Sequence, residues 1–143
     1  MAIAVVPLLC VVGIPFAFHS YDVATRPDRS APDVVVNNYL QAFLVDRDDA
    51  VAGNFACVDK SGLAPLAAFR TQIESGEQRA GQSVTFTWVE GTVVSAGPDS
   101  ASLDVRIVAT VGGVSGGGSE TDSWTFTTHR TNVWCVSAAS KLD

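Results

Sequence analysis

The first 21 residues of the chain carry no Asp, Glu, Lys or Arg, and most of them form one apolar run, AIAVVPLLCVVGIPFAF. A helix needs roughly 20 apolar residues to cross the hydrocarbon core of a bilayer, and about 18 stand here. The apolar part of a cleaved signal is shorter, usually about 7–15 residues. The sequence therefore favours an uncleaved membrane helix over residues 1–21. A cleaved signal segment and a buried core helix are the alternatives.

Two cysteines, Cys57 and Cys135, lie far apart in the chain beyond this opening. A domain that follows a membrane helix can lie outside the cytoplasm, where disulfides form and persist. A bond between these cysteines would close a long loop, which stabilises a fold by roughly 4–5 kcal/mol in the chain-entropy treatment. The sequence favours this disulfide, and the alternative is a pair of buried free thiols in a cytosolic chain. The spacing of zinc ligands does not occur in the sequence, so no metal site is expected.

The 143 residues carry a formal net charge of −6. A nucleic-acid-binding domain would show a basic stripe, so no nucleic-acid partner is expected. The length suits one globular domain. A polar, proline-containing stretch separates this domain from the apolar opening. The sequence therefore divides into a membrane or signal segment at 1–21, a linker at 22–31 and a domain at 32–143.

Helical periodicity dominates the first half of the domain. Pro32, with an acidic residue directly after it, is typical of a first helical turn. The apolar residues that follow recur at helical spacing on one face: Val36, Tyr39, Leu40, Phe43 and Leu44. A short second helix is predicted over about 50–56. A third helix is predicted to open at Ser61-Gly62 and to end at Gly76.

From Gln82 the apolar period changes to two, which is the period of β-strands. Strands are predicted over 83–94, 101–111, 123–129 and 132–138, with a bulge at Gly91 in the first of them. Helices followed by a run of antiparallel strands predict an α+β fold. In such a fold the helices pack on one face of a curved antiparallel sheet.

Two parts of the chain carry a family resemblance. The run from Val36 to Phe43, the acidic turn after it and the segment from Ala50 to Cys57 resemble the first two helices of the nuclear transport factor 2-like superfamily. The ending Trp124-Thr125-Phe126 and Val133-Trp134-Cys135-Val136 resembles the closing hairpin of these cone-shaped α+β domains. The superfamily also includes ketosteroid isomerase, SnoaL-type cyclases and limonene epoxide hydrolase.

The paired cysteines are similar to those of actinobacterial membrane-anchored envelope proteins of the Mce-associated type. Similar domains also occur in periplasmic scaffold subunits of conjugation and type IV secretion machines. The resemblance implies a membrane helix followed by a cone-shaped domain on the extracytoplasmic side of the cell membrane.

The resemblance permits an enzyme, so the chemistry of the cone must be considered residue by residue. Tyr39 falls where ketosteroid isomerases carry a tyrosine that donates to the developing oxyanion. That reaction also needs a carboxylate base inside the cone. Asp59 is the one acid just past the second helix, and it stands beside Lys60 in a turn. No catalytic residue and no cofactor is therefore assigned.

The apolar faces of the predicted elements are expected to line the interior of the cone. The candidate lining residues are Tyr39, Phe43, Phe86, Trp88, Leu103, Ile107, Trp124 and Phe126. Trp134 has the opposite strand parity to Cys135 and is expected to be exposed. Exposed tryptophans are favoured at protein interfaces, which makes Trp134 the candidate partner contact.

The sequence thus predicts a non-enzymatic accessory or scaffold domain of a membrane-associated complex, similar to transport or secretion machines. Protein partners in the envelope, the membrane itself and a homo-oligomer are the expected associations. A module that binds a small apolar ligand or lipid in the cone is one alternative, and an isomerase-like enzyme is another.

Overall fold

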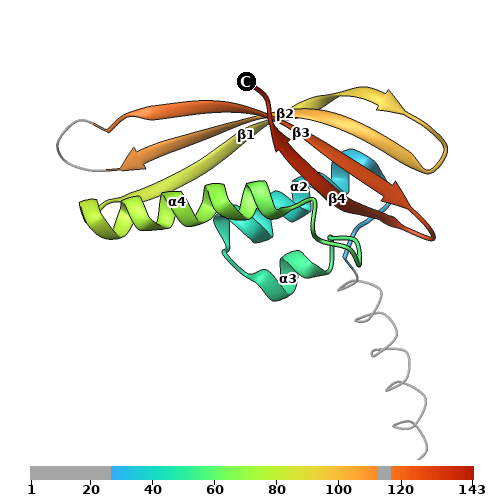
Figure 1. The fold of residues 1–143 in the computed structure, drawn as a ribbon, viewed down its shortest axis with the longest axis horizontal. Helices are drawn as coiled ribbons and strands as arrows, with labels where there is room; N and C mark the ends of the chain where they lie inside the picture. The colour runs from blue at the N-terminus through green and yellow to red at the C-terminus, as the bar shows by residue number, and fades with distance from the viewer. Residues whose placement is uncertain (1–26, 113–116) are drawn as a thin grey trace, which may run out of the picture.

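The computed structural model describes residues 27–112 and 117–143, so the predicted membrane segment at 1–21 and residues 22–26 of the predicted linker lie outside the described residues. Within the described residues, four helical segments precede the sheet: α2 (Pro32–Leu40), η1 (Gln41–Val45), α3 (Asp49–Gly53) and α4 (Ala64–Ala80). Four strands follow: β1 (Ser83–Ala96), β2 (Ser100–Gly112), β3 (Ser119–Arg130) and β4 (Trp134–Lys141). The predicted α+β fold, with its helices below one face of a curved antiparallel sheet, is confirmed (Figure 1).

The sheet is an antiparallel meander with the strand order β1-β2-β3-β4. The pairing of β1 with β2 is interrupted twice, between Val89 and Thr92 and between Val93 and Ser95. Gly91 lies in the first interruption, and a Cβ built there would collide with the carbonyl oxygen of Asp104. The predicted bulge at Gly91 is therefore confirmed, and close backbone approach is the reason for a glycine at this position.

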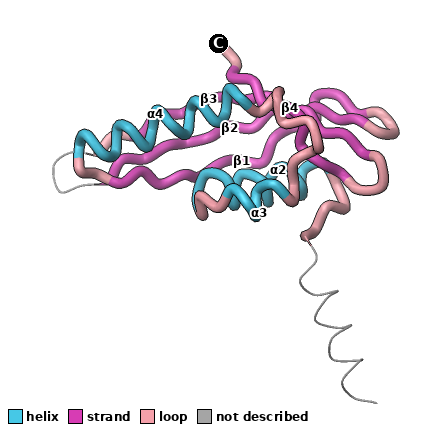
Figure 2. The backbone as a smooth tube through the Cα atoms, turned by 60° about the horizontal axis from the view of Figure 1, so that its bottom comes forward, coloured by secondary structure: helices cyan, strands magenta, loops and turns pink. Residues whose placement is uncertain are grey.

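The first predicted helix forms in two parts, because α2 continues into the π-helix η1. All five residues of its predicted apolar stripe are buried. Asp48 caps α3 by accepting hydrogen bonds from the backbone N–H groups of Ala50 and Val51, both at 3.0 Å. Figure 2 shows α4 separated from the pair formed by α2 and α3.

The prediction that the third helix ends at Gly76 is wrong. Helix α4 continues through this glycine to Ala80, and it ends at Gly81, which has a φ of 64°. An internal glycine weakens a helix by only about 1 kcal/mol and does not by itself end it. Glu77 directly follows this glycine and accepts hydrogen bonds from Arg47 and from the backbone N–H of Val84 in β1. These bonds fix the last turn of α4.

The outer edge of β4 is covered by the segment that joins α3 to α4. Backbone bonds run from Val136 N–H to Phe55 and from Cys57 N–H to Val136, both at 2.9 Å, and from Ala139 N–H to Gly62 at 3.0 Å. The predicted disulfide between Cys57 and Cys135 is confirmed, and it joins the same segment to the same strand. Both hydrogen bonds and a covalent bond therefore protect this edge against pairing with other strands.

Arg29 extends the cover of the β4 edge toward the N-terminus. Its carbonyl accepts from Trp134 N–H at 3.2 Å, and its Nε donates to the carbonyl of Trp134 at 2.9 Å. The chain is therefore already bound to the sheet at Arg29, within the stretch that the sequence predicts to be a linker. Among residues 27–112 and 117–143, no helix has the length and apolarity that a membrane crossing requires.

Candidate functional site

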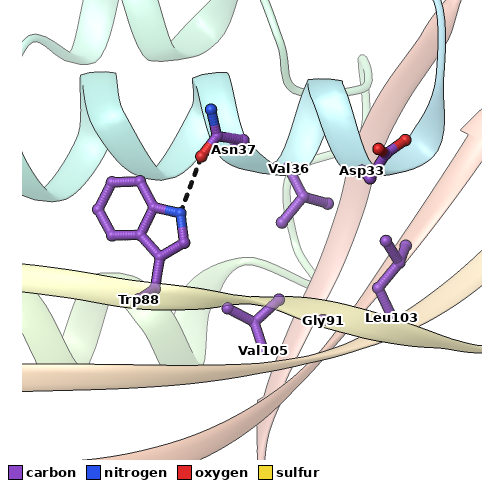
Figure 3. A pocket seen from close by; sticks show the side chains of 7 residues that line it. All are labelled: Asp33, Val36, Asn37, Trp88, Gly91, Leu103 and Val105. Carbon is purple, nitrogen blue, oxygen red and sulfur yellow. Dashed lines mark hydrogen bonds between the residues drawn. The ribbon is translucent and has the colours of Figure 1, made fainter.

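The residues predicted to line an apolar cone form the hydrophobic core instead. Seven of them are buried: Tyr39, Phe43, Phe86, Leu103, Ile107, Trp124 and Phe126. Trp88 is partly buried and packs against this core. The cavity between α2 and the sheet has a volume of about 10 Å³, and of the predicted lining residues only Trp88 and Leu103 reach it (Figure 3). A cavity of this size holds at most one water molecule.

A hydrogen bond closes this cavity on one side. The indole Nε1 of Trp88 on β1 donates to Oδ1 of Asn37 on α2 at 2.9 Å (Figure 3). The bond satisfies the one polar atom of a large, partly buried side chain. The space under α2 is therefore a packed contact between helix and sheet.

A larger hollow of about 200 Å³ lies on the helical side of the molecule. It is lined by Tyr39 of α2, Phe43 of η1, Asp49, Ala52 and Gly53 of α3, and Ala56 and Lys60 of the following loop. The rings of Tyr39 and Phe43 stack with centroids 5.3 Å apart and form one wall. Tyr39 and Phe43, two of the predicted lining residues, thus lie together at a hollow. This hollow lies beside α3 and not beside the sheet.

Arg70 of α4 fixes the charged side of this hollow. Its guanidinium binds both carboxylate oxygens of Asp49, at 2.8 and 3.1 Å. It also donates to the carbonyl of Phe43 at 3.0 Å and lies 4.1 Å from the centroid of the Phe43 ring. A bidentate ion pair combined with a cation–π contact locks the Phe43 wall in place.

The titratable groups of the hollow are poorly matched to proton transfer at neutral pH. Burial raises the pKa of Tyr39 to about 12, so its hydroxyl stays protonated. The hydrogen bonds from Arg70 lower the pKa of Asp49, so this carboxylate stays ionised and is a weak base. Efficient general acid–base catalysis needs a pKa near the working pH.

Asp59, the acid next to the second helix, lies in a turn at the surface. Its carboxylate accepts a hydrogen bond from Ser61 N–H at 2.9 Å, and this bond lowers the pKa of Asp59. It does not line the hollow that holds Tyr39. Within residues 27–112 and 117–143, no group of three or more His, Cys, Asp or Glu side chains could hold a metal ion.

The prediction that Trp134 is exposed is wrong. The side chain is only 7% exposed, and it shares the inward face of β4 with Val136. The prediction assumed that Cys135 points into the core, whereas Cys135 lies on the opposite face of the strand and bonds to Cys57. The guanidinium of Arg130 lies 5.4 Å from the centroid of the Trp134 ring. Trp134 is therefore a core residue at the end of the sheet and is not available as a partner contact.

Asp49, Lys60 and Arg70 belong to the hollow or its wall, and sequence reasoning did not find them as site residues. Asp49 and Arg70 lie 21 residues apart on different helices, so no local pattern pairs them. The one usable signal was the position of Asp49 directly before the helix predicted over about 50–56, where an acid is expected as a helix cap alone.

Comparison with known proteins identifies solved structures that share the fold of this chain. No family model matches the chain, and no curated protein matches it. An IcmL-like type IV secretion system protein from Legionella pneumophila subsp. pneumophila str. Philadelphia 1 superposes with a TM-score of 0.58 at 12% sequence identity. The match covers 81% of this chain and 93% of that one.

A second solved structure, a candidate aromatic ring hydroxylase from Novosphingobium aromaticivorans, superposes with a TM-score of 0.51 at 14% identity. That match covers 77% of this chain and 87% of the other. Because both identities are low, these likenesses bear on the fold alone. The resemblance to Mce-associated proteins stays a prediction. The chain therefore shares its α+β fold with a secretion-system protein and a candidate enzyme.

Proposed function

We propose that this protein is a non-enzymatic accessory or scaffold domain of a membrane-associated complex of the secretion type. The observation that carries the proposal is the Cys57–Cys135 disulfide, because stable disulfides are typical of domains outside the reducing cytoplasm. A membrane helix over residues 1–21 would place the domain at the outer side of the cell membrane.

Two further observations support this role. The IcmL-like neighbour belongs by name to a type IV secretion system, which is a multi-protein assembly. Two titratable groups of the helical hollow, Tyr39 and Asp49, have pKa values displaced away from neutrality in opposite directions. Such a pair suits a binding surface better than proton transfer.

A module that binds an apolar ligand or lipid is the second candidate, and one observation favours it. Two surface hollows of about 310 and 280 Å³ flank the C-terminal half of α4 and share Ile73, Val84 and Val111 as apolar lining. If this candidate is right, lipid will co-purify with the full chain and will be lost in a Val111→Asp variant. Mass spectrometry of the organic extract measures both.

The proposal is tested in the native host with the full chain carrying a C-terminal tag. We expect Cys57 and Cys135 to resist a maleimide–polyethylene glycol reagent until a reductant is added. We also expect external protease to digest the domain in protoplasts. In-cell cross-linking should shift the tagged chain into discrete species of higher mass. Free thiols together with protection from external protease would place the domain in the cytoplasm and overturn the proposal.

A further inference from the structure

We infer that two copies of this chain pair through the open edge of β1, antiparallel to each other about a two-fold axis at Thr87. The inference goes beyond the proposed function, because it concerns how two copies join and not which complex they enter. The strand order leaves β1 and β4 as the two edges of the sheet. The segment at 55–62 of the same molecule bonds to β4, whereas no strand of the described chain pairs with the outer side of β1 (Figure 2).

The hydrogen bonds of Val84 show which backbone groups of β1 face the open edge. Its N–H donates to the carboxylate of Glu77 at 2.6 Å and so points away from β2. Its partner in register, Val111 of β2, donates its own N–H at 2.9 Å to the carbonyl of Gly118, directly before β3. Val84 and Val111 are therefore a non-hydrogen-bonded pair, and such pairs alternate with hydrogen-bonded pairs along an antiparallel ladder.

Phe86 and Trp88 share the parity of Val84, so their backbone groups also face the open edge. The register with β2 continues unbroken from Val84 to Val89. Among residues 27–112 and 117–143, the backbone N–H and C=O groups of Phe86 and Trp88 have no hydrogen-bond partner on this side. A row of unpaired backbone groups at a sheet edge is a template for another strand, which the added strand satisfies with its own backbone.

Two features limit the open part of this edge to residues 85–89. Glu77 already occupies the N–H of Val84 at one end. At the other end the register with β2 breaks between Val89 and Thr92. A bulge bends the strand and increases its twist, which protects the rest of the edge against pairing. Five residues are therefore left for an added strand.

The sequence of this open stretch, TFTWV, complements itself in antiparallel orientation. When Thr87 lies opposite its own copy, Phe86 lies opposite Trp88 and Thr85 lies opposite Val89. The outward backbone groups of Phe86 in one molecule then meet those of Trp88 in the other, as a hydrogen-bonded pair requires. Pairs of threonines and pairs of aromatic residues are favourable across neighbouring strands. No residue of the stretch is charged, so like charges do not face each other.

The side chains on the outer face of the stretch are accessible to a second copy. Thr85 and Thr87 are exposed, and Val89 is 61% exposed although it is aliphatic. Pairing removes part of the Val89 surface from water. Pairing of this kind also ends at two molecules, because the same edge is used in both copies and the segment bonded through Cys57 covers the edge of β4.

Cysteine trapping tests the two-fold axis directly. The full chain in detergent carries Cys10→Ser in every variant, so that the native disulfide is the only other cysteine pair. In Thr87→Cys the two new thiols face each other in a non-hydrogen-bonded pair, where the Cα atoms are about 4.5 Å apart and a disulfide can form. We expect mild oxidation to convert this variant into a covalent dimer on a non-reducing gel.

Neighbouring positions on the same strand are the matched controls. In Thr85→Cys the two thiols would be separated by four residues along the strand, or about 14 Å, which is too far for a disulfide. Val89→Cys alone is separated in the same way. An equal mixture of Thr85→Cys and Val89→Cys should form a covalent heterodimer at least tenfold faster than either variant alone. Equal cross-linking of Thr85→Cys and Thr87→Cys, or no cross-linking of Thr87→Cys, overturns the inference.

Hydrogen exchange and sedimentation test the pairing without new cysteines. Raising the concentration of the unmodified full chain to about 1 mM half-fills a dimer with a millimolar Kd. The amides of Phe86 and Trp88 should then exchange more slowly, whereas that of Val84 should not change, because Glu77 already binds it. A protein that stays monomeric at this concentration overturns the inference.

A lysine on the axis should break the dimer. Thr87→Lys brings two like charges together at the edge and should weaken dimerisation at least tenfold. Thr121→Lys is the matched control, because Thr121 is also exposed and lies in the same row, two strands away, with Val108 between them. Its dimerisation should equal that of the unmodified protein. A dimer that Thr87→Lys does not weaken uses another surface, and this result contradicts the inference.

The in-cell cross-linking assay separates this inference from the proposed function. If Thr87→Lys removes the species of twice the chain mass and leaves the others, both stand. If Thr87→Lys leaves every species unchanged, the complex exists but the copies do not join through β1. If the purified chain dimerises as expected while the domain in cells has free thiols and is protected from external protease, the β1 pairing stands and the proposed function fails.

Discussion

Single residues in this protein matter most where two backbones approach each other closely. Gly91 sits in the first bulge of β1, opposite the carbonyl oxygen of Asp104. Gly62 is a second example, because a Cβ there would lie 2.6 Å from the carbonyl oxygen of Ser137. At both positions backbone atoms surround the missing side chain, so the neighbours cannot turn aside.

Replacing Gly91 tests whether the close approach of the two backbones requires a glycine. We expect Gly91→Ala to lower the free energy of unfolding by at least about 2 kcal/mol, because the new methyl group must displace the β2 backbone. Urea denaturation of the full chain measures the change. Gly112→Ala is the matched control within the sheet, since its nearest contact would be an ordinary 3.7 Å, and it should be close to neutral. Equal effects of the two variants would contradict the argument.

Among the elements, α4 depends on one carboxylate for the position of its last turns. Glu77 receives two hydrogen bonds from Arg47, at 2.7 and 2.9 Å, and one from the backbone N–H of Val84 at 2.6 Å. It therefore joins the turn after η1, helix α4 and the start of β1. Arg47 has a φ of 54°, and the bidentate pair compensates for this left-handed conformation.

The Glu77 contacts predict a defined pH dependence of stability. The hydrogen bonds from Arg47 lower the pKa of Glu77, so its stabilising contribution is fully present above the ordinary glutamate pKa of about 4.3. The contribution is lost as the pH falls below that value through the folded-state pKa. We expect Glu77→Gln to lower the free energy of unfolding by about 1 kcal/mol at pH 7 and by less at pH 3.

Chemical denaturation at both pH values measures this difference. Glu74→Gln is the control on the same helix, because Glu74 makes only a 3.4 Å contact with Arg70, and its effect should be smaller. A Glu77→Gln effect that is the same at pH 3 and pH 7 would show that the ion pair is not its source.

For the whole molecule, the disulfide is the main tie between the helical side and the sheet. It spans 78 residues and joins the loop after α3 to the last strand. The backbone bonds of Phe55, Cys57 and Gly62 to β4 lie along the same contact. The helices of the first half are thus held to the strand that closes the fold.

Removing the disulfide should be the largest single change in stability. We expect the double variant Cys57→Ser and Cys135→Ser to lose about 4–5 kcal/mol of unfolding free energy, as the chain-entropy treatment gives for a loop of this length. Guanidinium denaturation with and without a reductant measures it. The reductant should destabilise the unmodified protein by a similar amount and leave the double variant unchanged. If the reductant has no effect on the unmodified protein, the disulfide does not hold the fold together.

Local periodicity was enough to predict the elements and most of the core. The alternation over residues 101–111 identified Leu103 and Ile107 as inward-facing, and both are buried. The helical stripe of α2 and η1 was found in the same way. These predictions succeed because the direction of a side chain within one element follows from its spacing alone.

Positions that depend on distant partners were decided only by the tertiary structure. Trp134 is buried because it shares the inward face of β4 with Val136, and the bond of Cys135 to Cys57, 78 residues away, lies on the opposite face; the strand pattern alone does not say which face is inward. Helix α4 continues beyond Gly76 because Glu77 accepts hydrogen bonds from Arg47 and from the backbone N–H of Val84. Asp49 lies beside Phe43 at the hollow because Arg70 binds both the Asp49 carboxylate and the carbonyl of Phe43. The sequence alone therefore determined the order, the period and the inward faces of the elements. Tertiary contacts decided where the helices end, which tryptophan is hidden and where a hollow remains, because each depends on residues far apart in the chain.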